Sequence, residues 1–313
     1  MILRELLKRY LPTCIVRTLR ELRISRGELL LIKLRFLSII GLRRKYIDDY
    51  TWFELQFKPR EALKYYGITL PSFPTDDVQR RFTARVGRNN LQQAFSFYRY
   101  VYSACNLNQV NEPRILDFGG GWGRISRFFL KDTKPEHILI TDCMNTSIHW
   151  LKATGNPCNI LKNEPLPPIA GLNMSFDLIY SFSVFSHLSE QFLRAWLTYL
   201  MESLRPGGFL VFTTRGHQFI NDIESLYREN SSSSLREKLP HHEEVRARYI
   251  KGEFQFYPTG GGDELNSDCY GETLVPRSYI EANYRSVLVD FTEEVPDVDQ
   301  SIVVLQKTQL DPD

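Results

Sequence analysis

The residues best suited to chemistry form one glycine-rich run near the middle of the chain. It reads Ile115-Leu116-Asp117-Phe118-Gly119-Gly120-Gly121-Trp122-Gly123-Arg124, and a helical pattern follows it. Glycines have no Cβ, so the backbone can come close to a ligand, and the first turn of a helix presents unpaired N–H groups and a positive dipole end. A loop of this kind after the first strand is where an open α/β sheet binds nucleotides.

The spacing excludes two common nucleotide-binding loops. A dinucleotide fingerprint, G-x-G-x-x-G/A, counted from Gly119 needs a small residue where Arg124 stands. A phosphate-binding P-loop needs Gly-Lys-Ser or Gly-Lys-Thr, and neither follows. The pattern that remains is D-x-G-x-G-x-G, with Asp117 as its carboxylate.

A second carboxylate, Asp142, ends the apolar run Ile138–Asp142 and lies 25 residues after Asp117. A carboxylate at the end of the second strand can accept hydrogen bonds from both hydroxyls of a ribose. The alternative is a helix N-cap or turn residue, because Asp is common at both places. Both interpretations stay open at this point.

The pattern D-x-G-x-G-x-G resembles the first motif of class I S-adenosylmethionine-dependent methyltransferases. Two later runs follow in the order of that family: Phe176–Leu188 is similar to its fourth strand and the loop after it, and Leu204–Val211 to the turn into its fifth strand. The resemblance covers about residues 114–215. It implies S-adenosyl-L-methionine as cofactor and a Rossmann-like, doubly wound sheet of seven mostly parallel strands with an antiparallel last strand.

The resemblance also implies which residues bind the cofactor. In the family the glycines lie against its methionine part, and the segment matched by Glu164-Pro165-Leu166-Pro167 lies beside its adenine, which makes Asn163 an adenine contact. The implied cofactor-binding residues are Asp117, Phe118, Gly119, Gly120, Gly121, Gly123, Arg124, Asp142, Cys143, Asn163 and Ser181. More weakly, residues 81–87 resemble a segment that precedes the domain in bacterial methyltransferases that modify small molecules or glycans.

His187 is the candidate catalytic residue, because it follows the fourth expected strand, on the acceptor side. Its unperturbed pKa near 6.5 suits a general base, which methyl transfer needs only when the acceptor is a weak nucleophile such as a hydroxyl. A structural hydrogen bond and a substrate contact are the alternatives. No metal site is expected, since His241-His242-Glu243-Glu244 places neighbouring side chains in different directions on a helix.

Short apolar runs alternating with helical patterns predict the elements that carry these residues. Strands are expected at 114–118, 138–141, 159–161, 176–182 and 209–213, with helices near 122–130, 145–153 and 190–204. Two β-prone runs, 286–293 and 300–307, predict an antiparallel pair at the sheet edge. We expect a basic helical arm at 1–58, a helical cap at 59–111, and the methyltransferase domain at 112–313 with an insertion at 217–268 that lacks a clear strand.

Charge is distributed unevenly over the 313 residues. Residues 1–45 hold 12 Lys and Arg against three Glu, a net charge of +9; the remaining 27 basic and 34 acidic residues give −7. This basic segment is either a helical cap with its charged face in water or an arm on an anionic membrane surface. Its apolar run at 29–42 is too short to span a bilayer, and no signal peptide is expected.

These observations predict a methyltransferase that modifies an oxygen or nitrogen of a small molecule, a sugar or a lipid-linked glycan. No nucleic-acid partner is expected, because the body is acidic and has no basic stripe with interleaved aromatics. Five dispersed cysteines favour reduced thiols and a cytoplasmic protein, with residues 1–45 able to contact the inner face of the membrane. The alternatives are a non-catalytic scaffold that keeps the fold and docks through the arm, and a nicotinamide-dependent reductase.

Overall fold

The computed structural model describes residues 47–58, 69–229, 234–260 and 265–308. The chain divides into two compact units, 1–70 and 71–313. The described part of the first unit contains helix α4 (Asp49–Leu55), whose N-terminus is capped by Asp48. Most of the predicted basic arm, residues 1–46, and the start of the predicted cap, residues 59–68, lie outside the described residues, so the expectations for them stay predictions.

The second unit is built around one sheet that carries the glycine-rich run. Its strands are β1 (Ile115–Phe118), β2 (Ile138–Asp142), β3 (Asn159–Lys162), β4 (Phe176–Ser181), β5 (Leu204–Thr214), β8 (Leu288–Thr292) and β9 (Ser301–Gln306). Its helices are α6 (Asp76–Thr83), α7 (Gly87–Ala104), α8 (Ser126–Phe129), α9 (Asn145–Ala153), α10 (Glu190–Glu202) and α14 (Arg277–Tyr284), with 3₁₀ turns η2 (Leu107–Gln109) and η3 (Pro135–His137).

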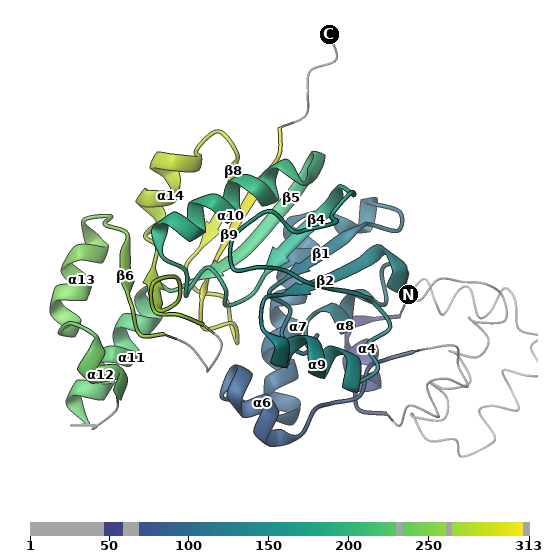
Figure 1. Cartoon of the computed structure of the whole chain (residues 1–313), viewed down its shortest axis with the longest axis horizontal. Coiled ribbons are helices and arrows are strands. Elements are labelled where there is room, and N and C mark those ends of the chain that lie inside the picture. The colour runs from purple at the N-terminus through teal and green to yellow at the C-terminus, as the bar shows by residue number, and fades with distance from the viewer. Residues whose placement is uncertain (1–46, 59–68, 230–233, 261–264, 309–313) are drawn as a thin grey trace, which may run out of the picture. The chain divides into compact units, whose positions relative to one another are not determined.

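The seven strands follow the order β3-β2-β1-β4-β5-β9-β8 (Figure 1). Strands β1 to β5 pair in parallel, whereas β9 pairs antiparallel with both β5 and β8. The chain moves outward from β1 to β3 and then resumes on the other side of β1 with β4. This topology confirms the predicted fold class, a doubly wound Rossmann-like sheet, and the predicted terminal antiparallel pair.

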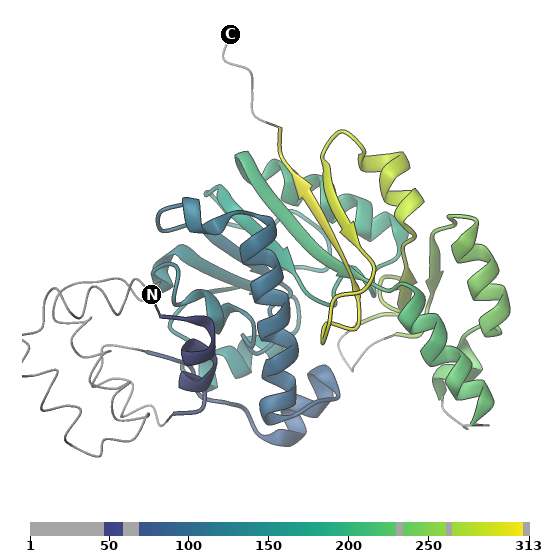
Figure 2. The same ribbon diagram turned by 180° about the vertical axis from the view of Figure 1, so that it is seen from behind.

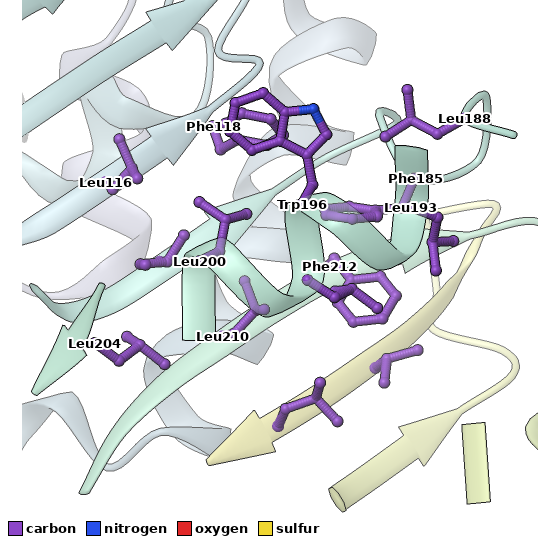
Figure 3. Close-up of a cluster of buried hydrophobic side chains, with 14 of the residues drawn as sticks. Leu116, Phe118, Phe185, Leu188, Leu193, Trp196, Leu200, Leu204, Leu210 and Phe212 are labelled. Atoms are coloured by element: carbon purple, nitrogen blue, oxygen red, sulfur yellow. The ribbon is translucent and has the colours of Figure 1, made fainter. Parts of the chain in front are cut away.

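Helices cover the sheet on both faces because its central strands are apolar on both sides. On one face a buried cluster joins alternate residues of the strands to α10, with Trp196 against Phe118 at 4.5 Å between ring centroids (Figure 3). On the opposite face, seen in Figure 2, α7 and α8 pack their rings against Tyr180 of β4. Phe97 of α7 and Phe129 of α8, which make these contacts, are fully buried and belong to the core.

The helix expected near residues 122–130 is much shorter than predicted, because α8 contains only Ser126–Phe129. Residues 122–125 form turns instead. Gly121 and Gly123 have φ values of +56° and +81°, a backbone conformation that a right-handed helix excludes. The glycines that make the loop thus also delay the start of the helix.

The prediction that residues 217–268 lack a strand is wrong. They contain α11 (His217–Arg228), α12 (Ser234–Lys238), α13 (His242–Ile250) and the strand β6 (Gln255–Tyr257). Strand β6 pairs antiparallel with β7 (Glu272–Leu274), and a second hydrophobic cluster joins this pair to α11 and α13. A strand of three residues is too short to show a periodic pattern in the sequence. No helix in the described part of the chain is long and apolar enough to cross a membrane.

The core on the α10 face supports a first prediction. Phe212 of β5 is fully buried there, so Phe212→Ala removes a ring and leaves a cavity, and we expect it to lower the free energy of unfolding by about 3–5 kcal/mol. Urea titration followed by tryptophan fluorescence measures the difference. Val289→Ala, at a side chain that is 51% exposed, is the control and should change stability by less than about 0.5 kcal/mol.

Candidate active site

A cavity lies at the carboxyl ends of β1, β2 and β4, where the chain switches from one side of β1 to the other. This is the place at which open α/β sheets bind ligands. The lining includes Asp117 to Trp122 from the glycine loop and residues from the ends of β2, β3 and β4. Of the eleven predicted cofactor-binding residues, nine line the cavity: Asp117, Phe118, Gly119, Gly120, Gly121, Arg124, Asp142, Cys143 and Asn163.

The glycine loop is folded tightly over the end of β2. The N–H groups of Gly119 and Gly120 both donate to the carbonyl oxygen of Thr141, at 2.8 and 3.0 Å. A Cβ on Gly119 would lie 2.2 Å from Val184 Cγ2, and one on Gly120 would lie 2.4 Å from Ile140 Cγ2. These two positions therefore have no room for a side chain while the loop keeps its shape.

Gly123 and Ser181 are the two predicted residues that do not line the cavity. A Cβ on Gly123 would approach Asn156 Nδ2 to 2.4 Å and Leu151 Cδ2 to 3.0 Å, so Gly123 allows the loop to pack against the C-terminal end of α9. The buried Ser181 hydroxyl donates to the Phe118 carbonyl oxygen at 2.9 Å and joins the ends of β4 and β1. Both residues support the loop through contacts that lie outside the cavity.

Asp142 orders the same loop through its carboxylate. Its Oδ2 accepts from the N–H of Gly121 at 3.0 Å, and its Oδ1 accepts from the N–H of Met144 at 2.9 Å. These contacts are those of the turn residue that the sequence allowed as an alternative. Asp142 also lines the cavity, and each carboxylate oxygen can accept more than one hydrogen bond, so ribose binding stays a prediction beside this role.

Two buried oxygens at the cavity lack a hydrogen-bond partner. Asn163 donates through Nδ2 to the Glu164 carbonyl oxygen at 2.7 Å, but its Oδ1 is unpaired. Asp117 Oδ2 is unpaired as well, and burial together with the charge of Asp142 raises the pKa of Asp117 to about 7. Because buried polar atoms are nearly always paired, these two atoms indicate places where a ligand would supply donors.

Arg124 lines the cavity but is held by the protein itself. Its Nη1 donates to the backbone and side-chain oxygens of Asn90 in α7, at 3.2 and 3.0 Å, and its guanidinium lies 4.6 Å from the ring centre of Phe182. Burial lowers the pKa of Arg124 to about 9. The side chain that excluded a dinucleotide fingerprint thus attaches the glycine loop to α7.

His187 also lines the cavity, and its ring is stacked on that of Tyr270 with a centroid distance of 4.6 Å and an interplanar angle of 9°. Its Nδ1 is 2.7 Å from the Gly271 carbonyl oxygen, which can only accept, so Nδ1 carries the proton and Nε2 has the lone pair. Burial and the charge of Arg215 lower the pKa of His187 to about 3. His187 is therefore a neutral hydrogen-bond acceptor in this structure, and its role as a base stays a prediction.

The cavity also includes residues that local sequence patterns did not reveal. They are Phe82 and Thr83 of α6, Trp122, Ile125, Met144, Pro165, Phe182, Ser183, Val184, Leu188, Phe192, Trp196, Leu265, Cys269 and Tyr270. For α6 a signal existed, since residues 81–87 resemble a segment that precedes the domain in methyltransferases. Tyr270 follows His187 by more than eighty residues, so only the fold brings the two rings together.

Comparison with known proteins identifies a domain that contains most of this site. Residues 116–210 match the family model of the methyltransferase domain. They include the glycine loop, β2, β3, β4, all of α10 and β5 as far as Leu210. Residues 116–210 form a methyltransferase domain. This match and the sheet topology confirm the predicted resemblance to class I methyltransferases.

Two curated proteins resemble the methyltransferase domain and its surroundings. Malonyl-acyl-carrier-protein O-methyltransferase of Bacteroides fragilis is 26% identical over 176 residues, which cover 52% of this chain and 33% of the relative. The enzyme of the same name from a Paenibacillus species is 25% identical over 159 residues, covering 49% and 53%. The chain thus matches about a third and about half of the length of these relatives.

Solved structures with similar arrangements are methyltransferases as well. CalS10, an amino pentose methyltransferase from Micromonospora echinaspora, has a TM-score of 0.48 and 13% identity, covering 76% of this chain and 99% of that structure. Magnesium protoporphyrin IX methyltransferase from Synechocystis has a TM-score of 0.47 and 12% identity, covering 80% and 98%.

The environment of His187 predicts a pH effect on stability. At pH above about 6.5 the imidazole is neutral in both states; as pH falls from about 6.5 toward about 3, the unfolded chain binds a proton that the folded protein does not. His187 therefore contributes a loss of stability approaching about 1.4 kcal/mol per pH unit on acidification. Urea unfolding between pH 7 and pH 4 should show this slope reduced in His187→Gln.

The control for this effect is His149→Gln, at an exposed position of α9. It should keep the slope of the unmodified protein. An unchanged slope in His187→Gln would show that the His187 imidazole titrates alike in the folded and unfolded chain, contrary to its burial.

Proposed function

We propose that the protein is an S-adenosylmethionine-dependent methyltransferase. The observation that carries this proposal is the glycine loop of the methyltransferase domain, which lies at the switch point of the sheet with two buried, unpaired oxygens beside it. Of the solved methyltransferases with similar folds, CalS10 is described with bound S-adenosylmethionine. The proposal rests on the match of residues 116–210 and on the site, whose residues suit this cofactor.

The cavity offers donors and acceptors that match the parts of the cofactor. Gly119 and Gly120 line the cavity with their backbone, against which the methionine part would lie, and Asp142 would accept from the ribose hydroxyls. The unpaired Asn163 Oδ1 suits an adenine amino group, which can only donate. Trp196, Phe192 and Leu188 provide apolar surface at this cavity for a planar base.

The cofactor, when bound, supplies a methyl group already activated by a sulfonium. The protein then has to orient the acceptor and exclude water, because a displacement in line with the breaking bond depends on alignment. The aromatic residues of the cavity serve the exclusion of water. His187, fixed by Gly271 with its Nε2 lone pair available, would accept a hydrogen bond from the acceptor.

The acceptor class proposed is a small molecule, a sugar or a lipid-linked glycan. The names of the two curated relatives refer to a malonyl group on an acyl carrier protein, and the solved structures include an enzyme acting on an amino pentose. Residues 217–268 would supply part of the acceptor surface. The segment 1–45 remains the proposed contact with an anionic membrane surface, on the basis of its net charge of +9.

The glycine loop gives the direct test of cofactor binding. Gly119→Ala places a Cβ against Val184 at a φ of +72°, so we expect calorimetric titration to show that binding of S-adenosylhomocysteine is lost or weakened at least about 100-fold. Gly171→Ala is a matched control, since Gly171 has a φ of +77° but no atom within 4 Å of the added Cβ. It should bind the ligand like the unmodified protein.

Absence of binding by the unmodified protein at millimolar S-adenosylhomocysteine would contradict the proposed function and favour the non-catalytic scaffold. A response to NADH and not to S-adenosylhomocysteine would favour the reductase. Binding that survives Gly119→Ala would place the cofactor elsewhere.

The unpaired amide oxygen gives a second, independent prediction. Asn163→Leu keeps the size of the side chain but removes the acceptor, so affinity for S-adenosylhomocysteine should fall about tenfold in the same titration. Asn159→Leu, at the exposed first residue of β3, the strand that Asn163 follows, is the control and should leave the affinity unchanged. Equal affinity in Asn163→Leu would show that Oδ1 does not contact the ligand.

A further inference from the structure

Ser183 has an unusual backbone conformation for a residue that faces the cavity. Its φ of +59° lies in the left-handed region, where a side chain costs about 1 kcal/mol relative to glycine. It comes two residues after the end of β4 and lines the cavity. A strained residue other than glycine at such a position suggests that its side chain is needed there.

A closed ring of hydrogen bonds holds Ser183 in this conformation. Its N–H donates to Thr213 Oγ1 at 2.7 Å, Thr213 Oγ1 donates to Gln300 Oε1 at 2.7 Å, and Gln300 Nε2 donates to Ser183 Oγ at 3.0 Å. The three residues come from the loop after β4, the end of β5 and the loop between β8 and β9. Gln300 is the donor in its bond with Ser183, so the Ser183 hydroxyl keeps its proton, which has only long contacts, 3.4 Å to Ser186 Oγ and 3.5 Å to His187 Nε2, and can be redirected to a closer acceptor.

Ser183 and His187 present a donor and an acceptor side by side. The distance between Ser183 Oγ and His187 Nε2 is 3.5 Å, and Ser186 Oγ lies 3.4 Å from Ser183 Oγ. One oxygen can lie about 2.8 Å from both Ser183 Oγ and His187 Nε2, accepting from the serine and donating to the imidazole. A neutral hydroxyl has both capacities, whereas a carboxylate can only accept.

The charged groups near this pair are Glu272 and Arg215, which form an ion pair with each other at 2.5 Å. Neither lines the cavity, whose lining includes the apolar and aromatic residues Phe82, Phe182, Val184, Leu265 and Tyr270. Among the described cavity-lining residues the single cation is Arg124, and its guanidinium already donates to Asn90. A negatively charged acceptor would therefore enter an apolar space with no free cation to compensate the cost of its desolvation.

We propose that Ser183 and His187 form a subsite for an uncharged hydroxyl carried on an aromatic acceptor, with Gln300 as the residue that positions Ser183. This subsite deepens the proposed function and rests on it, because it assigns the acceptor class of the same cavity. The Ser183 hydroxyl donates a hydrogen bond to the oxygen of the substrate hydroxyl. The same substrate hydroxyl donates a hydrogen bond to His187 Nε2.

Small aromatic probes test the subsite without knowledge of the natural acceptor. Phenol, toluene and benzoate share one ring and differ in carrying a neutral hydroxyl, a methyl group or a negative charge. With S-adenosylhomocysteine present, ligand-observed NMR at neutral pH should show millimolar binding of phenol, about five- to tenfold weaker binding of toluene, and no detectable binding of benzoate. The proposal would be overturned if benzoate bound as tightly as phenol, or if phenol showed no detectable binding.

Ser183→Gly separates the hydroxyl from the fold. It removes the side chain and accommodates the positive φ, so the variant should unfold at a temperature equal to or above that of the unmodified protein while it loses the preference for phenol over toluene. Asn106→Gly relieves a φ of +48° away from the cavity lining and should leave the preference unchanged. A preference retained in Ser183→Gly would refute the role of Ser183.

Gln300→Met tests the positioning role with Gln306→Met as control, because Gln306 donates to the Gly207 carbonyl oxygen at the other end of β9. The readout is the ¹⁵N resonance of His187 Nε2, which phenol should shift in the unmodified protein and in Gln306→Met but at least about fivefold less in Gln300→Met. An equal shift in both variants would contradict the role of Gln300.

Failure of the subsite and failure of the proposed function give different results. The three probes are also titrated without S-adenosylhomocysteine, and the cofactor analogue is titrated alone. Loss of S-adenosylhomocysteine binding with an intact preference for phenol would contradict the proposed function; binding of the analogue without any preference would contradict only the subsite.

Discussion

The site depends on one short connection, the pair of hydrogen bonds from Gly119 and Gly120 to the carbonyl oxygen of Thr141. They fold the end of β1 over the end of β2 and bring the loop so close to Val184 and Ile140 that no Cβ fits. Asp142 then fixes the next residue of the loop, Gly121, through its carboxylate. The N–H groups of Gly119, Gly120 and Gly121 are hydrogen-bonded to β2, which keeps the loop folded back and leaves its other side open as the wall of the cavity.

The tight fold of the glycine loop also explains the environment of two charged side chains, Asp117 and Arg124. Asp117 is enclosed by the loop that it precedes, and its burial raises the pKa of its carboxyl to about 7. Arg124, at the end of the loop, finds its partners in α7 and not in a ligand. The loop is thus held from two sides, by β2 and by α7, and a ligand meets a surface that is already formed.

Local sequence patterns predicted those parts of the fold that depend on short stretches of sequence. The strands, the order of the motifs and the glycine loop follow from apolar runs and turn residues, and the structure has them at nearly the expected places. The helix after the loop was placed too early, because the positive φ values of Gly121 and Gly123 postpone it to Ser126. The strand β6 was missed because its three residues are too few to show a periodic pattern, and only the tertiary fold pairs them with β7.

Side chains joined only by the tertiary fold could not be predicted. The stack of His187 on Tyr270, the contribution of Phe82 from α6 and the ring that holds Ser183 each join segments far apart in the chain. The resemblance to methyltransferases implied that Ser181 contacts the cofactor, whereas in the structure its hydroxyl donates to the Phe118 carbonyl oxygen, between β4 and β1. A pattern places a residue near the sheet edge, but the neighbouring strand decides whether its side chain faces the ligand.

The loop between β8 and β9 has a consequence for synthesis of the protein. Gln300 of this loop is hydrogen-bonded to Ser183. The loop also accepts hydrogen bonds from α7: Gln93 donates to the Val298 carbonyl oxygen and to Asp299, and Ser96 donates to Asp297. During translation, the glycine loop and the first five strands leave the ribosome well before these residues do. The nascent chain can therefore form the cofactor side of the cavity first, and the acceptor side is completed only after β9 has been made and inserted beside β5.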